Sequence, residues 1–157
     1  MLSPNTTRIR RDAASEASPK QPFAALTGLC KATADSLRLL ILRVLRNDSY
    51  GVSELCSIFD MRQPALSHHL KVLAGAGLVA ARREGNSIFY RRAELGQRPD
   101  LEVLQSAIFE TLDQIVLPPD ICRRLRDLQR RRELNSRNFF RDNASKFHQQ
   151  QDLIASY

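Results

Sequence analysis

Apolar residues recur every three or four positions over most of residues 23–128, which is the spacing of amphipathic helices. The first stripe predicts a helix up to about Thr33, and the second predicts a helix whose N-cap is Asp35. The stripes comprise Phe23, Leu26, Leu29 and Cys30, and then Leu37, Leu40, Ile41, Val44 and Leu45. Both stripes imply faces that pack into a core.

The pattern of residues 51–92 changes from a helical to a strand period. Residues 51–59 predict a short helix, residues 60–62 a turn, and residues 63–76 a second helix with Leu66, Leu70 and Leu73 on its inner face. Residues 79–83 and 87–92 are rich in β-formers and are joined at Glu84-Gly85-Asn86. This order predicts a helix-turn-helix followed by a β-hairpin.

Three further patterns follow one another along the chain, at residues 34–42, residues 67–79 and residues 83–90. Together they resemble the ArsR/SmtB family of bacterial transcriptional regulators, with Ser36 in place of that family's usual Pro. The resemblance covers about residues 24–93. It implies a mainly α winged helix-turn-helix with a small β-hairpin wing, dimerising through the first and fifth helices. It also implies a sequence-specific regulator, most simply a repressor released from a palindromic double-stranded DNA operator by an effector.

The second helix of this unit carries polar residues suited to reading DNA. By the helical period, Gln63, Ser67 and Lys71 share the outer face, with His68 beside them. Arg62 precedes the helix where related sequences place a capping Ser or Thr, and a guanidinium cannot accept the capping bond. We therefore expect Arg62 to contact phosphate. The predicted DNA contacts are Arg62, Gln63, Ser67, His68, His69, Lys71, and, from the wing, Arg83, Asn86 and Arg92.

A further apolar stripe begins after Pro99-Asp100 and predicts a helix over residues 100–116. Its simplest partner is its own copy in a second subunit, packed together with the first helix. The residues expected in this homodimer interface are Leu26, Leu101, Leu104, Ile108, Leu112 and Ile115.

Length and charge suggest one domain with extensions. The 157 residues divide into a disordered arm (1–21), a DNA-binding and dimerisation domain (22–117) and a helical C-terminal extension (118–157). The net charge of +7 is segregated: residues 62–92 carry six positive and one negative side chain, residues 93–122 one and six, and residues 123–141 eight and two. No apolar run approaches the length of a membrane span, and residues 1–22 lack a signal-peptide core, so we expect a cytoplasmic protein.

Candidate metal and catalytic chemistry is sparse. The family's arsenic sensors carry paired cysteines in the third helix, whereas Cys56 is followed by Ser57 and Ile58, and residues 100–116 contain no histidine for zinc. We expect Cys30, Cys56 and Cys122 to be small buried apolar residues, and we expect no metal or cofactor. A thiol or soft-metal sensor using Cys30 and Cys56 is one alternative, and a protein-interaction module with incidental DNA binding is another. No glycine-rich phosphate loop or nucleophile motif is present, so no enzyme is expected.

The basic tail has a looser resemblance of its own. After Pro118-Pro119 a last helix carries Ile121, Leu125 and Leu128, and residues 138–140 and 147–154 then alternate polar and apolar positions. Residues 130–157 resemble the connector of longer ArsR-type regulators that leads into an S-adenosylmethionine-dependent methyltransferase domain. The resemblance implies a short relative or a truncated form, and an S-adenosyl compound as the effector.

Overall fold

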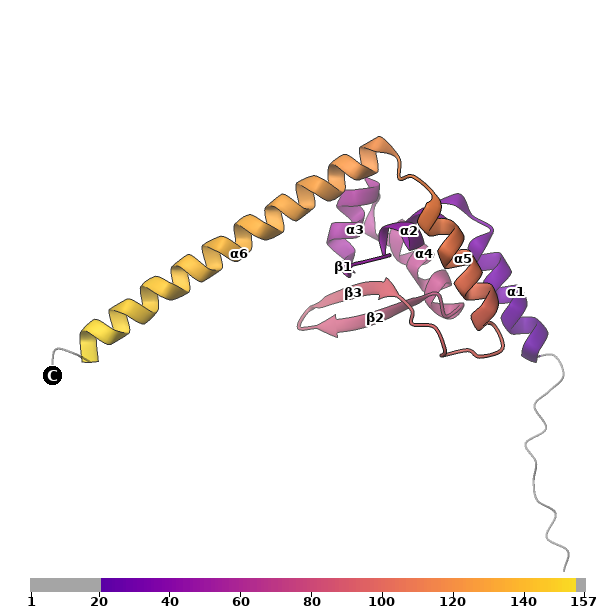
Figure 1. Cartoon of the computed structure of the whole chain (residues 1–157), viewed down its shortest axis with the longest axis horizontal. Coiled ribbons are helices and arrows are strands. Elements are labelled where there is room, and N and C mark those ends of the chain that lie inside the picture. Colours follow the sequence, from indigo (N-terminus) through magenta and orange to yellow (C-terminus); the bar gives the residue numbers. More distant parts are fainter. Residues whose placement is uncertain (1–20, 155–157) are drawn as a thin grey trace, which may run out of the picture.

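The computed structural model describes residues 21–154, with side chains for residues 23–144. The predicted arm, except Gln21, and residues 155–157 lie outside this range. Six helices and three short strands follow one another in it (Figure 1). In order they are α1 (Gln21–Thr33), α2 (Ser36–Val44), β1 (Tyr50–Gly51), α3 (Val52–Phe59), α4 (Gln63–Gly75), β2 (Val79–Glu84), β3 (Ser87–Arg92), α5 (Glu102–Gln114) and α6 (Pro119–Ile154).

The core forms where the inner faces of the helices meet. Leu66, Leu70 and Leu73 on α4 are 0% exposed, which confirms the predicted inner face. The predicted N-cap of α2 is also confirmed, because the Arg38 backbone N–H donates to Asp35 Oδ1 at 2.9 Å. The helix that Asp35 caps buries Ile41 in this core, so the capping residue and the apolar stripe of α2 favour the same helix.

Helix α4 ends in a motif that directs the chain into the wing. The N–H of Gly77 donates to Ala74 O, and that of Leu78 donates to Leu73 O, both at 3.0 Å. These two bonds form a Schellman motif, whose left-handed position is Gly77 at φ 72°. Leu78 is fully buried, which anchors the start of β2 against the core.

The wing is part of a three-stranded antiparallel sheet of order β1-β3-β2. The predicted hairpin is confirmed, with Glu84 opposite Ser87 and a two-residue turn at Gly85 and Asn86. Only Gly85 of this turn has a positive φ (57°), the pattern of a type II′ hairpin turn. Strand β1, whose Tyr50 pairs with Tyr90 of β3, was not predicted, because a strand of two residues is too short to show an alternating pattern.

The apolar residues predicted for the dimer interface along α5 differ in exposure within the single chain. Leu101 and Leu112 are only 8% and 4% exposed, because they pack into the protomer's own core together with Phe109. Leu104 and Ile115 are exposed, and Ile108 is half-buried. Only part of the predicted stripe is therefore free to meet a second subunit.

Helix α6 is continuous over 36 residues and passes through the segments of alternating polarity without a break. Ile121 and Leu128 are buried in the same core as α3, so its first turns belong to the winged-helix body. Beyond Arg132, which still contacts α3 through Glu54, the helix runs away from that body (Figure 1). In the described part of the chain, no helix is both long and apolar enough to span a bilayer.

Candidate nucleic-acid interface

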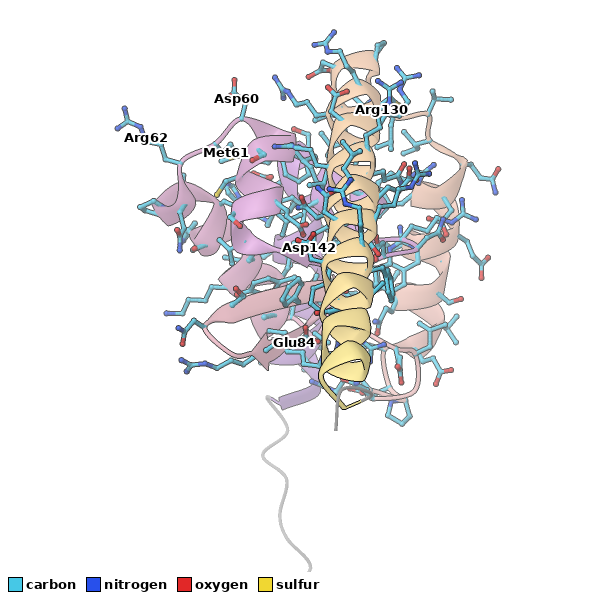
Figure 2. All side chains as sticks on the ribbon, turned by 90° about the vertical axis from the view of Figure 1, so that its left-hand side faces the viewer. Asp60, Met61, Arg62, Glu84, Arg130 and Asp142 are labelled. Atoms are coloured by element: carbon cyan, nitrogen blue, oxygen red, sulfur yellow. The ribbon has the colours of Figure 1, made fainter. Side chains whose placement is uncertain are left out.

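The turn between α3 and α4 sets the geometry of the helix-turn-helix. Asp60 closes α3 in the left-handed region (φ 52°), which Asp tolerates better than most residues, and Met61 N–H donates to Cys56 O at 3.1 Å. Arg62 is the N-cap of α4, and its side chain makes no capping bond, as its chemistry requires. Figure 2 shows Asp60 and Arg62 projecting outward from this turn. A guanidinium placed there is free to meet an approaching phosphate.

The outer face of α4 is polar and accessible. Gln63, His68 and Lys71 are exposed, and Ser67 is half-buried. Gln63, Ser67 and Lys71 follow one another along a single side of the helix at one-turn intervals. With its apolar face packed inward, α4 offers this polar side to a partner, and a helix of this kind fits the DNA major groove.

His69 occupies the other flank of α4. It is half-buried, and its Nδ1 is buried without a hydrogen-bond partner among the described residues. Asp35, at the start of α2, has a pKa below its ordinary value, chiefly because the Arg38 backbone N–H donates to it. His69 follows Gln63 by six positions, so the helical period places it on a different side of α4.

Gln63 and Asn86 come together although they belong to different elements. Both line a groove of about 410 Å³, whose other walls are the start of α3 (residues 51–54) and the wing residues 87–89. The sequence predicted these two residues separately and missed Val52 and Ser53. No local signal marks those two, because the groove arises only when the wing folds beside α3. We call it the reading groove.

The wing carries exposed arginines along both of its strands. Arg82 pairs with Glu84, and Arg91 pairs with Glu94 at 2.8 Å. Arg83 is exposed, and its Nε donates to Gly85 O at 3.2 Å. These contacts are at the surface and worth little individually, so the side chains remain available to phosphates.

Arg92 differs from the other wing arginines, and its position argues against the predicted phosphate contact. Its Nε donates to Leu42 O at 2.7 Å, and its Nη2 donates to Asp113 Oδ1 at 2.8 Å. Its guanidinium carbon also lies 4.6 Å from the centre of the Phe109 ring. With its side chain only 10% exposed, Arg92 ties β3 to α2 and α5.

The cysteines are free, and they differ in exposure. Cys56 and Cys122 are half-buried, whereas Cys30 on α1 is exposed, so the predicted burial of Cys30 is wrong. Among the side chains that the structure describes, residues 23–144, no three His, Cys, Asp or Glu gather in a way that could hold a metal ion.

A helix-turn-helix with an exposed polar second helix and a basic β-hairpin beside it defines a winged helix-turn-helix protein. Comparison with known proteins narrows this class. Residues 35–81 match the family described as bacterial regulatory protein, arsR family. The transcriptional activator HlyU of Vibrio cholerae is 38% identical over 76 residues, which cover 48% of this chain and 70% of HlyU. The chain belongs to the ArsR family of transcriptional regulators.

Two further relatives bear on assembly and function. The biofilm growth-associated repressor of Agrobacterium fabrum is 46% identical over 66 residues, or 42% of this chain. The chain spans only 56% of that repressor's length. The homodimeric winged helix-turn-helix DNA-binding domain of a possible ArsR-family regulator from Mycobacterium bovis superposes with a TM-score of 0.50 at 27% identity. The superposition covers 64% of this chain and 91% of that domain.

Proposed function

We propose that the chain is a homodimeric, sequence-specific DNA-binding repressor that leaves a palindromic operator when an effector binds. The observation that carries the proposal is the reading groove, where Gln63 of α4 and Asn86 of the wing face one space. The α4 side chains would read base edges in the major groove, and Arg62 and Arg83 would contact flanking phosphates. The Agrobacterium relative is named as a repressor, which supports repression as the function.

Dimerisation would place two copies of α4 on one operator. Large apolar side chains on α1 and α5 are open to solvent in the single chain: Phe23 is 74% exposed and Val103 84%. Leu26, Leu104 and Ile115 extend this surface. Apolar surface of this kind favours association, and a two-fold dimer presents two recognition helices to successive major grooves. The homodimeric domain from Mycobacterium bovis supports the same assembly.

The effector would act by population shift, favouring a dimer geometry in which the two helices no longer match the operator. A non-metal effector suits this chain better than a metal, since Cys56 has no second cysteine beside it and α5 has no histidine. The tail's resemblance to methyltransferase-linked regulators nominates an S-adenosyl compound. Calorimetry with zinc, arsenite and both S-adenosyl compounds tests this choice. Tight arsenite or zinc binding that releases DNA, and that Cys56→Ser abolishes, would overturn it.

Base reading by α4 is the most direct test of the function. A preferred DNA sequence is first selected from a random pool by binding to the wild type. Fluorescence anisotropy then measures the affinity of the wild type, Gln63→Ala and His68→Ala for this sequence and for a scrambled one. Loss of a good base contact is expected to cost about 1–3 kcal/mol on the selected sequence and much less on scrambled DNA. Gln129→Ala, an exposed glutamine on α6, is the matched control. Equal losses on both DNAs would rule out a role in specificity.

A further inference from the structure

A single arginine of α6 joins four groups next to the helix-turn-helix. Arg132 Nε donates to Glu54 Oε1 at 2.8 Å, and its Nη2 donates to Glu54 Oε2 at 2.6 Å. Its Nη1 donates to Asp48 Oδ2 at 2.7 Å, and Nη2 also donates to Ser49 O at 3.0 Å. The guanidinium carbon lies 4.9 Å from the centre of the Tyr50 ring. A guanidinium with this many hydrogen-bond partners fixes the position of α6 on the body, which a solvated charge would not do.

The two carboxylates held by Arg132 each line one of two grooves beside the wing. Glu54 lines the reading groove with Gln63 and Asn86, and its Oε2 accepts the Gly51 N–H at 2.9 Å at the start of α3. Asp48 lines a second groove of about 650 Å³, together with Arg82 of the wing. Burial tends to raise the pKa of Glu54, but the hydrogen bonds from Arg132 and Gly51 outweigh it and hold that pKa below its ordinary value. Glu54 is therefore charged at neutral pH.

Two unneutralised carboxylates at this place would repel the DNA phosphates. We propose that Arg132 is a positioning residue for DNA binding: it neutralises Glu54 and Asp48 beside the reading groove, so DNA affinity depends on α6 being docked on α3. The proposal rests on the proposed DNA-binding function. Arg124 holds the same helix one turn before Leu128, because its Nη1 donates to Ile58 O at 3.0 Å.

Docking of α6 thereby connects a distant part of the chain to DNA binding. The helix continues well beyond Arg132 and leaves the body, as Figure 1 shows. A force or partner that lifts α6 from α3 withdraws the guanidinium and exposes both carboxylates at once. DNA affinity then falls although no residue of α4 has changed.

Charge variants of the full chain separate this role from simple stabilisation. Arg132→Gln is expected to weaken binding to the selected DNA roughly tenfold, because the carboxylates of Glu54 and Asp48 would then repel the DNA phosphates without a neutralising partner. Glu54→Gln keeps an amide oxygen for the Gly51 N–H while removing the charge, so its affinity is expected to equal or exceed that of the wild type. The double variant is expected to recover most of the affinity lost in Arg132→Gln. Removing the unpaired Glu54 charge would also restore stability, so the rescue supports the proposal only where every variant is fully folded when its affinity is measured.

The control is Arg130→Gln, which removes the same charge from an exposed neighbour on α6 that has no ion-pair partner among the described residues (Figure 2). Affinities are measured well below each variant's unfolding temperature, which is determined separately. Equal affinities for Arg132→Gln and Arg130→Gln would overturn the inference, as would absent rescue in the double variant. If Arg132→Gln does not fold, weakened binding by Glu54→Gln alone overturns it. A wild type that binds no DNA would instead overturn the proposed function.

Discussion

Helices α4 and α5 have the same length, 13 residues each, yet they use their apolar residues differently. Helix α4 has one apolar stripe, which its own protomer buries completely, and its opposite side is polar. Helix α5 buries Phe109 and Leu112 but leaves Val103 and Leu104 in solvent. A helix with one apolar side is satisfied by its own core and can offer a polar side to DNA. A helix with apolar residues on two sides, such as α5, keeps one of those sides exposed in the single chain.

Leu104→Asp tests the open side of α5 and carries the largest expected effect. A charge placed in an apolar interface without a partner is expected to weaken association by roughly 3–5 kcal/mol, leaving monomers at micromolar concentration. Sedimentation velocity measures the change, and circular dichroism checks that the fold is kept. Gln129→Asp on α6 introduces the same charge away from α5 and is expected to remain dimeric. If the wild type is itself monomeric at micromolar concentration, the exposed side of α5 does not form a homodimer interface.

Leu112→Ala tests the buried side of the same helix. Removing these methyl groups leaves a cavity in the core and is expected to lower the free energy of unfolding by about 2–5 kcal/mol, as measured by urea denaturation. The variant is expected to stay dimeric under conditions where it is folded, the reverse of Leu104→Asp. If folded Leu112→Ala dissociated as readily as Leu104→Asp, the assignment of the two sides would be wrong.

The wing arginines show what sequence reasoning could and could not reach. Helical periodicity predicted the inner face of α4, and β-forming residues around Glu84-Gly85-Asn86 predicted the hairpin. Arg83 and Arg92 looked equivalent because both are basic residues on wing strands. They differ only through tertiary contacts, since the partners of Arg92 lie on α2 and α5. For the same reason periodicity could not separate the buried from the exposed apolar residues of α5, nor foresee the Arg132 contacts, because it identifies a face of a helix but not the neighbour of that face.

Arg83→Ala and Arg92→Ala should therefore behave differently. Loss of buried hydrogen bonds in Arg92→Ala is expected to lower the free energy of unfolding by about 1–3 kcal/mol. Arg83→Ala is expected to leave stability unchanged but to reduce the slope of log affinity against log salt by about 0.9, the effect of one lost phosphate contact. Titrations at several salt concentrations, paired with denaturation curves, measure both. An unchanged slope in Arg83→Ala would remove it from the DNA interface.

The Glu54–Arg132 pair predicts a smaller, pH-dependent effect. Because the pKa of Glu54 in the folded chain lies below its ordinary value of 4.5, the ionised form stabilises the fold above that pH. This contribution is expected to be lost as pH falls below 4.5 through the folded-state pKa. Glu54→Gln should show a correspondingly shallower decline in unfolding temperature between pH 5 and pH 3. Identical declines in both proteins would show that the pair contributes nothing to acid stability.

The spacing of the two recognition helices on DNA tests the whole arrangement most directly. Hydroxyl-radical footprinting on the selected sequence, with the number of bound chains counted by sedimentation, would report it. Two chains are expected to protect two half-sites whose centres lie about 10 base pairs, or a multiple of that, apart on an inverted repeat. A single protected half-site occupied by one chain would contradict an assembly in which α5 joins the subunits and α4 reads the DNA.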